Sequence, residues 1–118
     1  IHLYCPFTKL KDLTAQHYRY CTSLGIPVVE SVTDLQACDL IVDGVFGFGL
    51  ERSLTDPIAA AIHTINQWSQ PVFSIDLPSG LHTDTGAVLG TALRATHTFC
   101  LGLWKLGLLQ DHALEFVG

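Results

Sequence analysis

Continuous apolar runs alternate with segments of helical spacing in the middle of the chain. The runs DLIVD (residues 39–43) and PVFSI (residues 71–75) are typical of strands in a parallel sheet that is buried on both faces. Between them, isoleucines recur at helical spacing after Asp56-Pro57, a favoured N-cap followed by a favoured first helical residue. The pattern therefore predicts a strand, a helix to about Trp68, and a second strand.

The flanking segments extend this alternation. A helix is predicted over residues 11–24, with Leu13, Tyr20 and Leu24 on one face, and a helical turn is predicted at 34–37. Alternation of strands and helices favours a mainly parallel sheet with helices on both faces, so we expect one α/β domain over residues 1–118. The remaining predicted strands are residues 1–4, 27–29, 97–103 and 114–117.

Composition narrows the classes of function. The chain has 118 residues, of which 48% are hydrophobic, enough to bury a core. A net charge of −5 and only six Lys and Arg argue against a nucleic-acid footprint and against binding to anionic membranes. Without a long apolar run or a basic leader, neither a membrane span nor a signal peptide is expected. Because the chain begins directly in a strand-like run, we expect it to be part of a longer protein.

Cysteines and histidines show no metal-binding spacing. The four cysteines include no C-x-x-C pair, and the six histidines form no H-E-x-x-H motif. Buried free thiols in a reducing compartment are therefore favoured over disulfides. We read the histidines, together with Asp84, as ordinary surface or core residues.

Two aspartates end the two strongest predicted strands. In open α/β sheets, ligands bind outside the carboxyl ends of the strands, where Asp43 and Asp76 would share one rim if their strands are neighbours. In the turn that follows Asp76, Pro78 and Gly80 would fix the Ser79 hydroxyl beside it. This oxygen-rich set suits a hard cation. The alternatives are a solvated strand end or cap at Asp43 and a simple Asp-started turn at Asp76.

A glycine-rich loop, residues 44–49, follows the first of these strands. It is neither G-x-G-x-x-G nor a Walker A loop, and a plain flexible connection is the alternative to a ligand-binding role. With the charge of Arg52 and the helix N-terminus near Pro57, the loop could wrap an anionic ligand. Lys105, after the predicted strand at 97–103, is either a solvated lysine or a further site residue.

Three blocks of this sequence resemble one known family. DLIVDGVFGFGLERSL, PVFSIDLPSGLHTDTGAVLG and RATHTFCLGLWKLGLL are similar, in order and separation, to the NAD(P)HX epimerase family, also called the YjeF amino-terminal domain. The resemblance implies a Rossmann-like three-layer α/β/α sandwich in the cytoplasm. It also implies a metabolite-repair isomerase that interconverts the R and S epimers of the hydrated cofactors NADHX and NADPHX, with a potassium ion at the site.

The resemblance also implies roles for individual residues. Asp43 and Ser79 match potassium contacts, and Asp76 matches the substrate-binding aspartate, which we expect to perform the acid/base chemistry. Lys105 lies where many members keep a lysine, and the resemblance implies that it contacts the hydrated nucleotide. The loop that contacts the hydrated nucleotide matches Gly47, Phe48, Gly49, Leu50, Glu51, Arg52 and Ser53.

One family feature is missing from the sequence. The family's G-N-N-G-G-D-G loop would lie upstream of Ile1. We therefore expect this chain to be the later part of the family's domain, and to be weakly active or inactive on its own. The resemblance further implies fusion to, or cooperation with, an NAD(P)H-hydrate dehydratase, and it allows a homodimer. Two other functions stay open: a non-catalytic nucleotide- or protein-binding module of the same fold, and another nucleotide or phospho-sugar enzyme.

Overall fold

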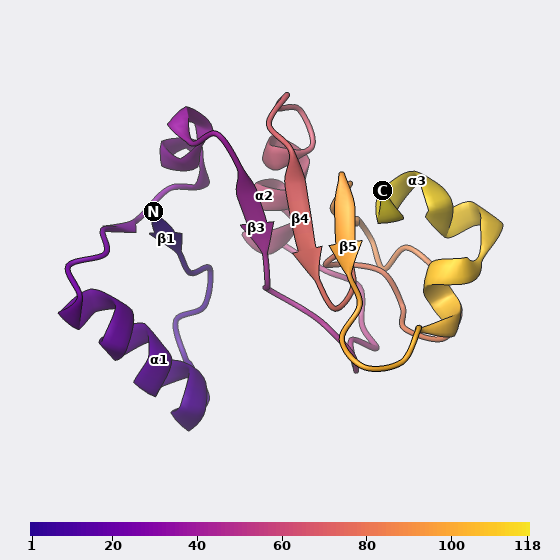
Figure 1. Ribbon diagram of the computed structural model, residues 1–118, viewed down its shortest axis with the longest axis horizontal. Helices are drawn as coiled ribbons and strands as arrows, with labels where there is room; N and C mark the ends of the chain where they lie inside the picture. The colour runs from indigo at the N-terminus through magenta and orange to yellow at the C-terminus, as the bar shows by residue number, and fades with distance from the viewer. The chain divides into compact units, whose positions relative to one another are not determined.

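The computed structural model describes all residues, 1–118, and divides them into two compact units, residues 1–38 and 39–118. In the first unit, the strands β1 (Leu3–Tyr4) and β2 (Val28–Val29) pair in parallel. The helix α1 (Asp12–Ser23) connects them, and the 3₁₀ helix η1 (Val32–Ala37) follows (Figure 1). These elements confirm the strands, the helix and the helical turn predicted for this part of the chain.

The apolar face predicted for α1 is exposed in the structure. Leu13, Tyr20 and Leu24 are 66%, 63% and 61% exposed, and α1 has no buried residue. Helical spacing thus located the helix correctly, because it depends on the local repeat, but it did not establish that the apolar face is covered.

The second unit contains a three-stranded parallel sheet in the order β3-β4-β5. Its strands are β3 (Ile41–Asp43), β4 (Val72–Ile75) and β5 (His97–Phe99), and Asp43 lies opposite Ser74 in the register. Because β3 and β4 are parallel neighbours, their carboxyl ends meet at one edge of the sheet, as predicted. The architecture confirms a mainly parallel α/β fold.

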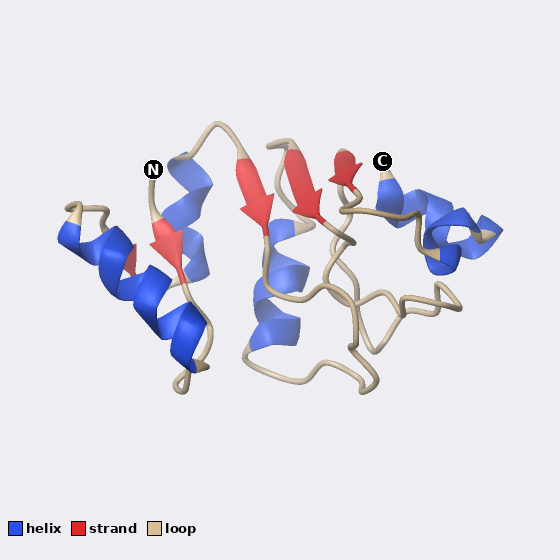
Figure 2. Ribbon diagram, turned by 60° about the horizontal axis from the view of Figure 1, so that its bottom comes forward, coloured by secondary structure: helices blue, strands red, loops and turns tan.

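Burial along β3 differs from the prediction of a strand buried on both faces. Ile41 and Asp43 are 6% and 3% exposed, whereas Val42 between them is 60% exposed. Successive side chains of a strand point to opposite faces, and the helix α2 (Ile58–Ile65) lies on one side of this sheet (Figure 2). The apolar run therefore indicated the strand but not how many of its faces are covered.

A cluster of buried side chains lies beside the sheet, beyond β5. It is built from the turn after β4 and from η2 (Leu106–Leu109), η3 (Asp111–Ala113) and α3 (Leu114–Val117). The strand predicted at 114–117 is thus a short helix, because a brief apolar run has no periodicity that separates the two. None of the helices is long and apolar enough to cross a membrane. The cluster comprises Leu77, Leu81, Ala92, Leu108, Ala113 and Phe116.

Asn66, at the end of α2, connects this helix to the segment before β5. Its Nδ2 donates to Ala92 O at 2.9 Å, and its Oδ1 accepts from the Arg94 amide at 2.9 Å. We expect Asn66→Ala to lower the free energy of unfolding by about 2 kcal/mol, because two backbone groups lose their partners. The exposed neighbour Gln67 supplies the control, since Gln67→Ala should change it by less than about 0.5 kcal/mol. Urea unfolding measures both variants, and equal losses would contradict the assignment.

Candidate functional site

Asp43 is a buried carboxylate at the end of β3, only 3% exposed. Its Oδ1 accepts from Ser79 Oγ at 2.6 Å and from the Val45 amide at 3.3 Å. Its Oδ2 accepts from Ser74 Oγ at 2.9 Å and from the Ser79 amide at 2.8 Å. Four hydrogen bonds on two oxygens join three segments: the loop after β3, the strand β4 and the turn after it.

Ser79 extends this arrangement to the glycine-rich loop. Its hydroxyl is fully buried, accepts from the Phe46 amide at 2.9 Å and lies 3.3 Å from Phe46 O. Gly80 makes the turn feasible, because its φ of +104° is left-handed and a side chain there would meet the backbone of Thr91. The structure thus joins Ser79 to Asp43, the pair that the resemblance implied, whereas the Asp76 carboxylate, beside which we expected the Ser79 hydroxyl, bonds to Lys105, Leu101 and Phe48.

The possible ligand atoms around Ser79 are oxygens, which suit a hard cation. A carboxylate, a hydroxyl and a carbonyl oxygen converge here without any nitrogen or sulfur ligand, which suits an alkali or alkaline-earth ion. No group of three or more His, Cys, Asp and Glu side chains is placed to hold a metal ion. The two predicted potassium contacts, Asp43 and Ser79, both belong to this oxygen-rich group.

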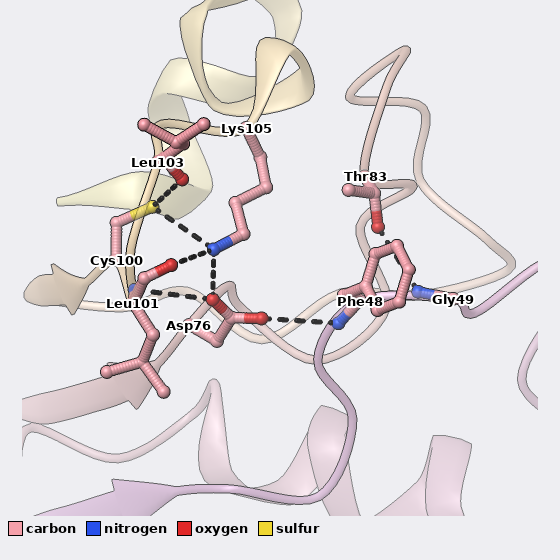
Figure 3. Close-up of polar contacts among 8 residues, drawn as sticks. All are labelled: Phe48, Gly49, Asp76, Thr83, Cys100, Leu101, Leu103 and Lys105. Atoms are coloured by element: carbon pink, nitrogen blue, oxygen red, sulfur yellow. Dashed lines mark hydrogen bonds and ion pairs between the residues drawn. The ribbon is translucent and has the colours of Figure 1, made fainter.

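Asp76 follows β4 and adopts a left-handed backbone conformation, φ +74°, which is uncommon for a residue other than glycine. Its amide donates to Phe99 O at 2.8 Å, which fixes its backbone to the end of β5. The carboxylate lies between Lys105 on one side and the Phe48 amide on the other (Figure 3). Backbone strain of this kind is concentrated at functional sites.

Lys105 forms an ion pair with Asp76 Oδ1. Both side chains are largely shielded, 13% exposed for Lys105 and 16% for Asp76. The ammonium also donates to Leu101 O at 2.6 Å and to Cys100 Sγ at 3.5 Å. The Cys100 thiol in turn donates to Leu103 O at 3.1 Å, so the segment after β5 wraps around the ammonium (Figure 3).

The ion pair shifts both titrations. Burial opposes ionisation of Asp76, but the hydrogen bond from Lys105, two backbone amides and the lysine charge hold its pKa below the ordinary value. The hydrogen bond to Asp76 outweighs burial at Lys105 and raises the pKa of that ammonium. Because the pKa of Asp76 is lowered, the pairing is complete above the ordinary pKa of aspartate. It is lost as the pH falls through the lowered pKa.

The loop residues predicted to contact a nucleotide lie in different surroundings. Gly47 passes close to Asp76, since a Cβ there would be 3.1 Å from Oδ2. Phe48 is 80% exposed beside it, whereas Leu50 is buried, only 8% exposed. The loop continues through Gly49, whose amide donates to Thr83 Oγ1 at 3.4 Å, and then through Glu51 and the exposed Arg52 and Ser53.

Sequence reasoning missed three contributors. Ser74 supports Asp43, and the only signal was a polar residue within the PVFSI run. Cys100 contacts Lys105, five residues away, although nothing in the sequence distinguished it. His82, interpreted as an ordinary residue, contacts Glu51 at 3.2 Å through Nε2 while its Nδ1 accepts amides of the following turn, so it joins that turn to the loop.

Comparison with known proteins gives close relatives. The chain is 62% identical over 118 residues to the bifunctional NAD(P)H-hydrate repair enzyme Nnr of Thermosynechococcus vestitus, which covers all of this chain and 23% of that protein. It is 39% identical over 94 residues to the NAD(P)H-hydrate epimerase of Oenococcus oeni, covering 80% of this chain and 45% of the relative. The chain thus spans about a quarter to a half of these relatives.

The fold and the family agree. The crystal structure of the yeast protein ynu0, YNL200c, superposes with a TM-score of 0.74 at 18% identity, covering 90% of this chain and 48% of that one. This likeness confirms the predicted Rossmann-like fold. The family described as YjeF-related protein N-terminus matches residues 1–107, which confirms the resemblance seen in the sequence. The chain therefore belongs to the YjeF-related protein N-terminus family.

Proposed function

We propose that the protein containing this chain is an NAD(P)H-hydrate epimerase that interconverts the R and S epimers of NADHX and NADPHX. The observation that supports it most is the Asp76 carboxylate, held between Lys105 and the glycine-rich loop in a left-handed backbone conformation. Relatives with 38% identity or more carry the names NAD(P)H-hydrate epimerase or bifunctional repair enzyme. Under this proposal, the two units, residues 1–38 and 39–118, both belong to one epimerase domain.

Epimerisation at C6 requires the hydroxyl to leave and return from the other face. The ring nitrogen pushes its electron pair toward C6, the C–O bond breaks as the oxygen takes up a proton from bulk solvent, and water departs. Water then adds to the opposite face of the cationic ring and loses a proton. Asp76 accepts that proton and releases it to solvent, which restores the carboxylate and balances the proton taken up when the hydroxyl left; in the reverse direction Asp76 donates the proton. Because its pKa is lowered, the carboxylate also places a negative charge beside the cationic ring.

Asp43 and Ser79 would hold the potassium ion, which would replace some of the hydrogen bonds that these two side chains make in this structure. When bound, the ion would supply positive charge to the oxygen-rich turn, and the buried Asp43 carboxylate would balance it. The hydrated nucleotide would lie along residues 47–53, with the backbone of Gly47 admitting it close to Asp76. In such a site Asp43 would bind the ion and Asp76 would take part in the reaction.

The same proposal extends to partners. The protein would cooperate with, or be fused to, an NAD(P)H-hydrate dehydratase, which consumes one epimer. It would act in the cytoplasm, where the free cysteines stay reduced, and the family resemblance allows a homodimer. The competing function, a non-catalytic binding module, is disfavoured because Asp43, Asp76 and Ser79 are all present.

Epimer equilibration tests the proposal. The natural full-length protein is mixed with one purified epimer of hydrated NADPH, and chromatography follows the other epimer in potassium chloride or in sodium chloride of equal ionic strength. We expect conversion well above the spontaneous rate, faster in potassium, and slower conversion by residues 1–118 alone. Conversion at the spontaneous rate by a folded protein would overturn the epimerase and favour the binding module.

A further inference from the structure

Lys105 uses all of its hydrogen-bond donors inside the protein. A lysine ammonium has three donors. One goes to Asp76 Oδ1, one to Leu101 O at 2.6 Å, and the third points to the weak acceptor Cys100 Sγ at 3.5 Å. An ammonium occupied in this way has no donor left for a phosphate or a sugar hydroxyl, unlike a lysine that binds the nucleotide directly.

The two oxygens of Asp76 differ as a consequence. Oδ1 accepts from Lys105 Nζ and from the Leu101 amide at 3.3 Å, which fills its two acceptor positions. Oδ2 accepts only from the Phe48 amide at 3.3 Å, so one acceptor position stays open. That open oxygen is the one beside Gly47, where a Cβ would approach to 3.1 Å.

We propose that Lys105 is a positioning residue, which clamps Oδ1 of Asp76 so that Oδ2 alone faces the reacting C6 hydroxyl. This inference rests on the proposed epimerase function and departs from the nucleotide contact that the resemblance implied for Lys105. The clamp acts through Asp76 and not through contact with the substrate.

The backbone on both sides of the clamp is held. Lys105 directly precedes η2, whose Gly107 and Leu108 are buried, and the Gly107 amide donates to Thr83 O at 2.8 Å. Asp76 is fixed by its own amide bond to Phe99 O at 2.8 Å. A clamp between two fixed points can hold a carboxylate in one orientation, which is what acid/base geometry requires.

The titratable groups in contact with the pair are few. Besides Asp76 and Lys105, the titratable group in contact is the Cys100 thiol. The glycine-rich loop contributes a backbone amide, that of Phe48, and no titratable side chain. Removal of the ammonium therefore leaves Asp76 with amide donors from Leu101 and Phe48 alone. The carboxylate gains freedom to rotate, and its ionised form loses its only neighbouring positive charge.

The test compares kcat and KM of the natural full-length protein as wild type and as Lys105→Met, over a range of pH. We expect kcat to fall about 100-fold, as misplaced reacting groups do, while KM changes less than about threefold. The acidic limb of the kcat/KM profile should move to higher pH, and Lys105→Arg should restore part of kcat. Lys9→Met, a change of an exposed lysine, should leave every parameter unchanged.

Other outcomes would overturn the assignment. A rise in KM above tenfold with kcat unchanged would make Lys105 a substrate contact, and no change in either would remove its role. If Lys105→Met does not fold, Lys105→Gln replaces it. If the wild type shows no epimerisation, NMR titration of ¹³C-labelled aspartate carboxyls tests the Lys105 clamp without relying on activity. The clamp requires the Asp76 titration to move to higher pH in the variant, and an unmoved titration refutes it.

Discussion

Asp76→Asn is expected to lower kcat of epimerisation by about 10²- to 10⁴-fold, the usual contribution of a positioned acid/base group. Asparagine has nearly the same shape, and its Oδ1 can still accept from Lys105 and from the Leu101 amide. The replaced oxygen is Oδ2, which becomes an amide group that cannot accept the proton of an incoming water. In the wild type, the Phe48 N–H donates to Oδ2 at 3.3 Å, and the new amide N–H group at that position cannot accept this hydrogen bond.

The measurement is the equilibration of one purified NADPHX epimer by wild-type and variant protein, each first checked by circular dichroism for an unchanged fold. Asp84→Asn is the matched control, because Asp84 lies exposed in the neighbouring turn, and we expect it to retain the wild-type rate. A rate for Asp76→Asn within threefold of wild type would exclude Asp76 as the acid/base group. A large loss of rate in Asp84→Asn as well would show that the loss comes from disturbing the turn and not from removing the Asp76 carboxylate.

The sequence was sufficient to predict the parts of the fold that depend on local repeats. The helix α1, the parallel strands β3 and β4 and the position of Asp43 and Asp76 at one edge all follow from periodicity and chain order. Periodicity could not decide burial, so the exposed Val42 and the exposed face of α1 were not predicted. It also failed at α3, where four apolar and acidic residues fit a strand as well as a helix.

The contacts within the site were less predictable, because they join residues far apart in the chain. The pairing of Lys105 with Asp76 spans 29 positions and depends on how the segment after β5 turns back, which no local pattern specifies. Likewise, Ser74 reaches Asp43 only because the register places them opposite each other. The family resemblance placed Lys105 among the nucleotide contacts and did not indicate its pairing with Asp76, which only the geometry shows.

Two carboxylates at one edge of the sheet are held in contrasting ways. Asp43 is buried and each of its oxygens accepts two hydrogen bonds, whereas Asp76 is on the rim and keeps one acceptor position open. Different environments for neighbouring carboxyl groups commonly accompany different roles in one reaction. The contrast supports assigning the chemistry to Asp76 and the organisation of the turn to Asp43.

Asp43→Asn is therefore expected to act on stability, with a loss of about 4 kcal/mol in the free energy of unfolding, because buried donors are left opposed to an amide N–H. Either orientation of the new amide faces donors: Ser74 Oγ with the Ser79 amide, or Ser79 Oγ with the Val45 amide. A loss of this size is a large share of the stability of a typical domain. Asp39→Asn, at an exposed aspartate just before β3, should change the stability by less than about 0.5 kcal/mol.

Thermal unfolding in potassium chloride against sodium chloride then separates the two roles open to Asp43. A ligand that binds only the folded state raises its stability, so a potassium ion on Asp43 and Ser79 should raise the Tm of the wild type and leave that of Asp43→Asn unchanged. If instead Asp43→Asn is destabilised while the wild type shows no preference for potassium, the carboxylate is purely structural and the ion proposal fails. A variant as stable as the wild type would contradict the four-bond arrangement itself, and with it the reason for placing Ser79 beside Asp43.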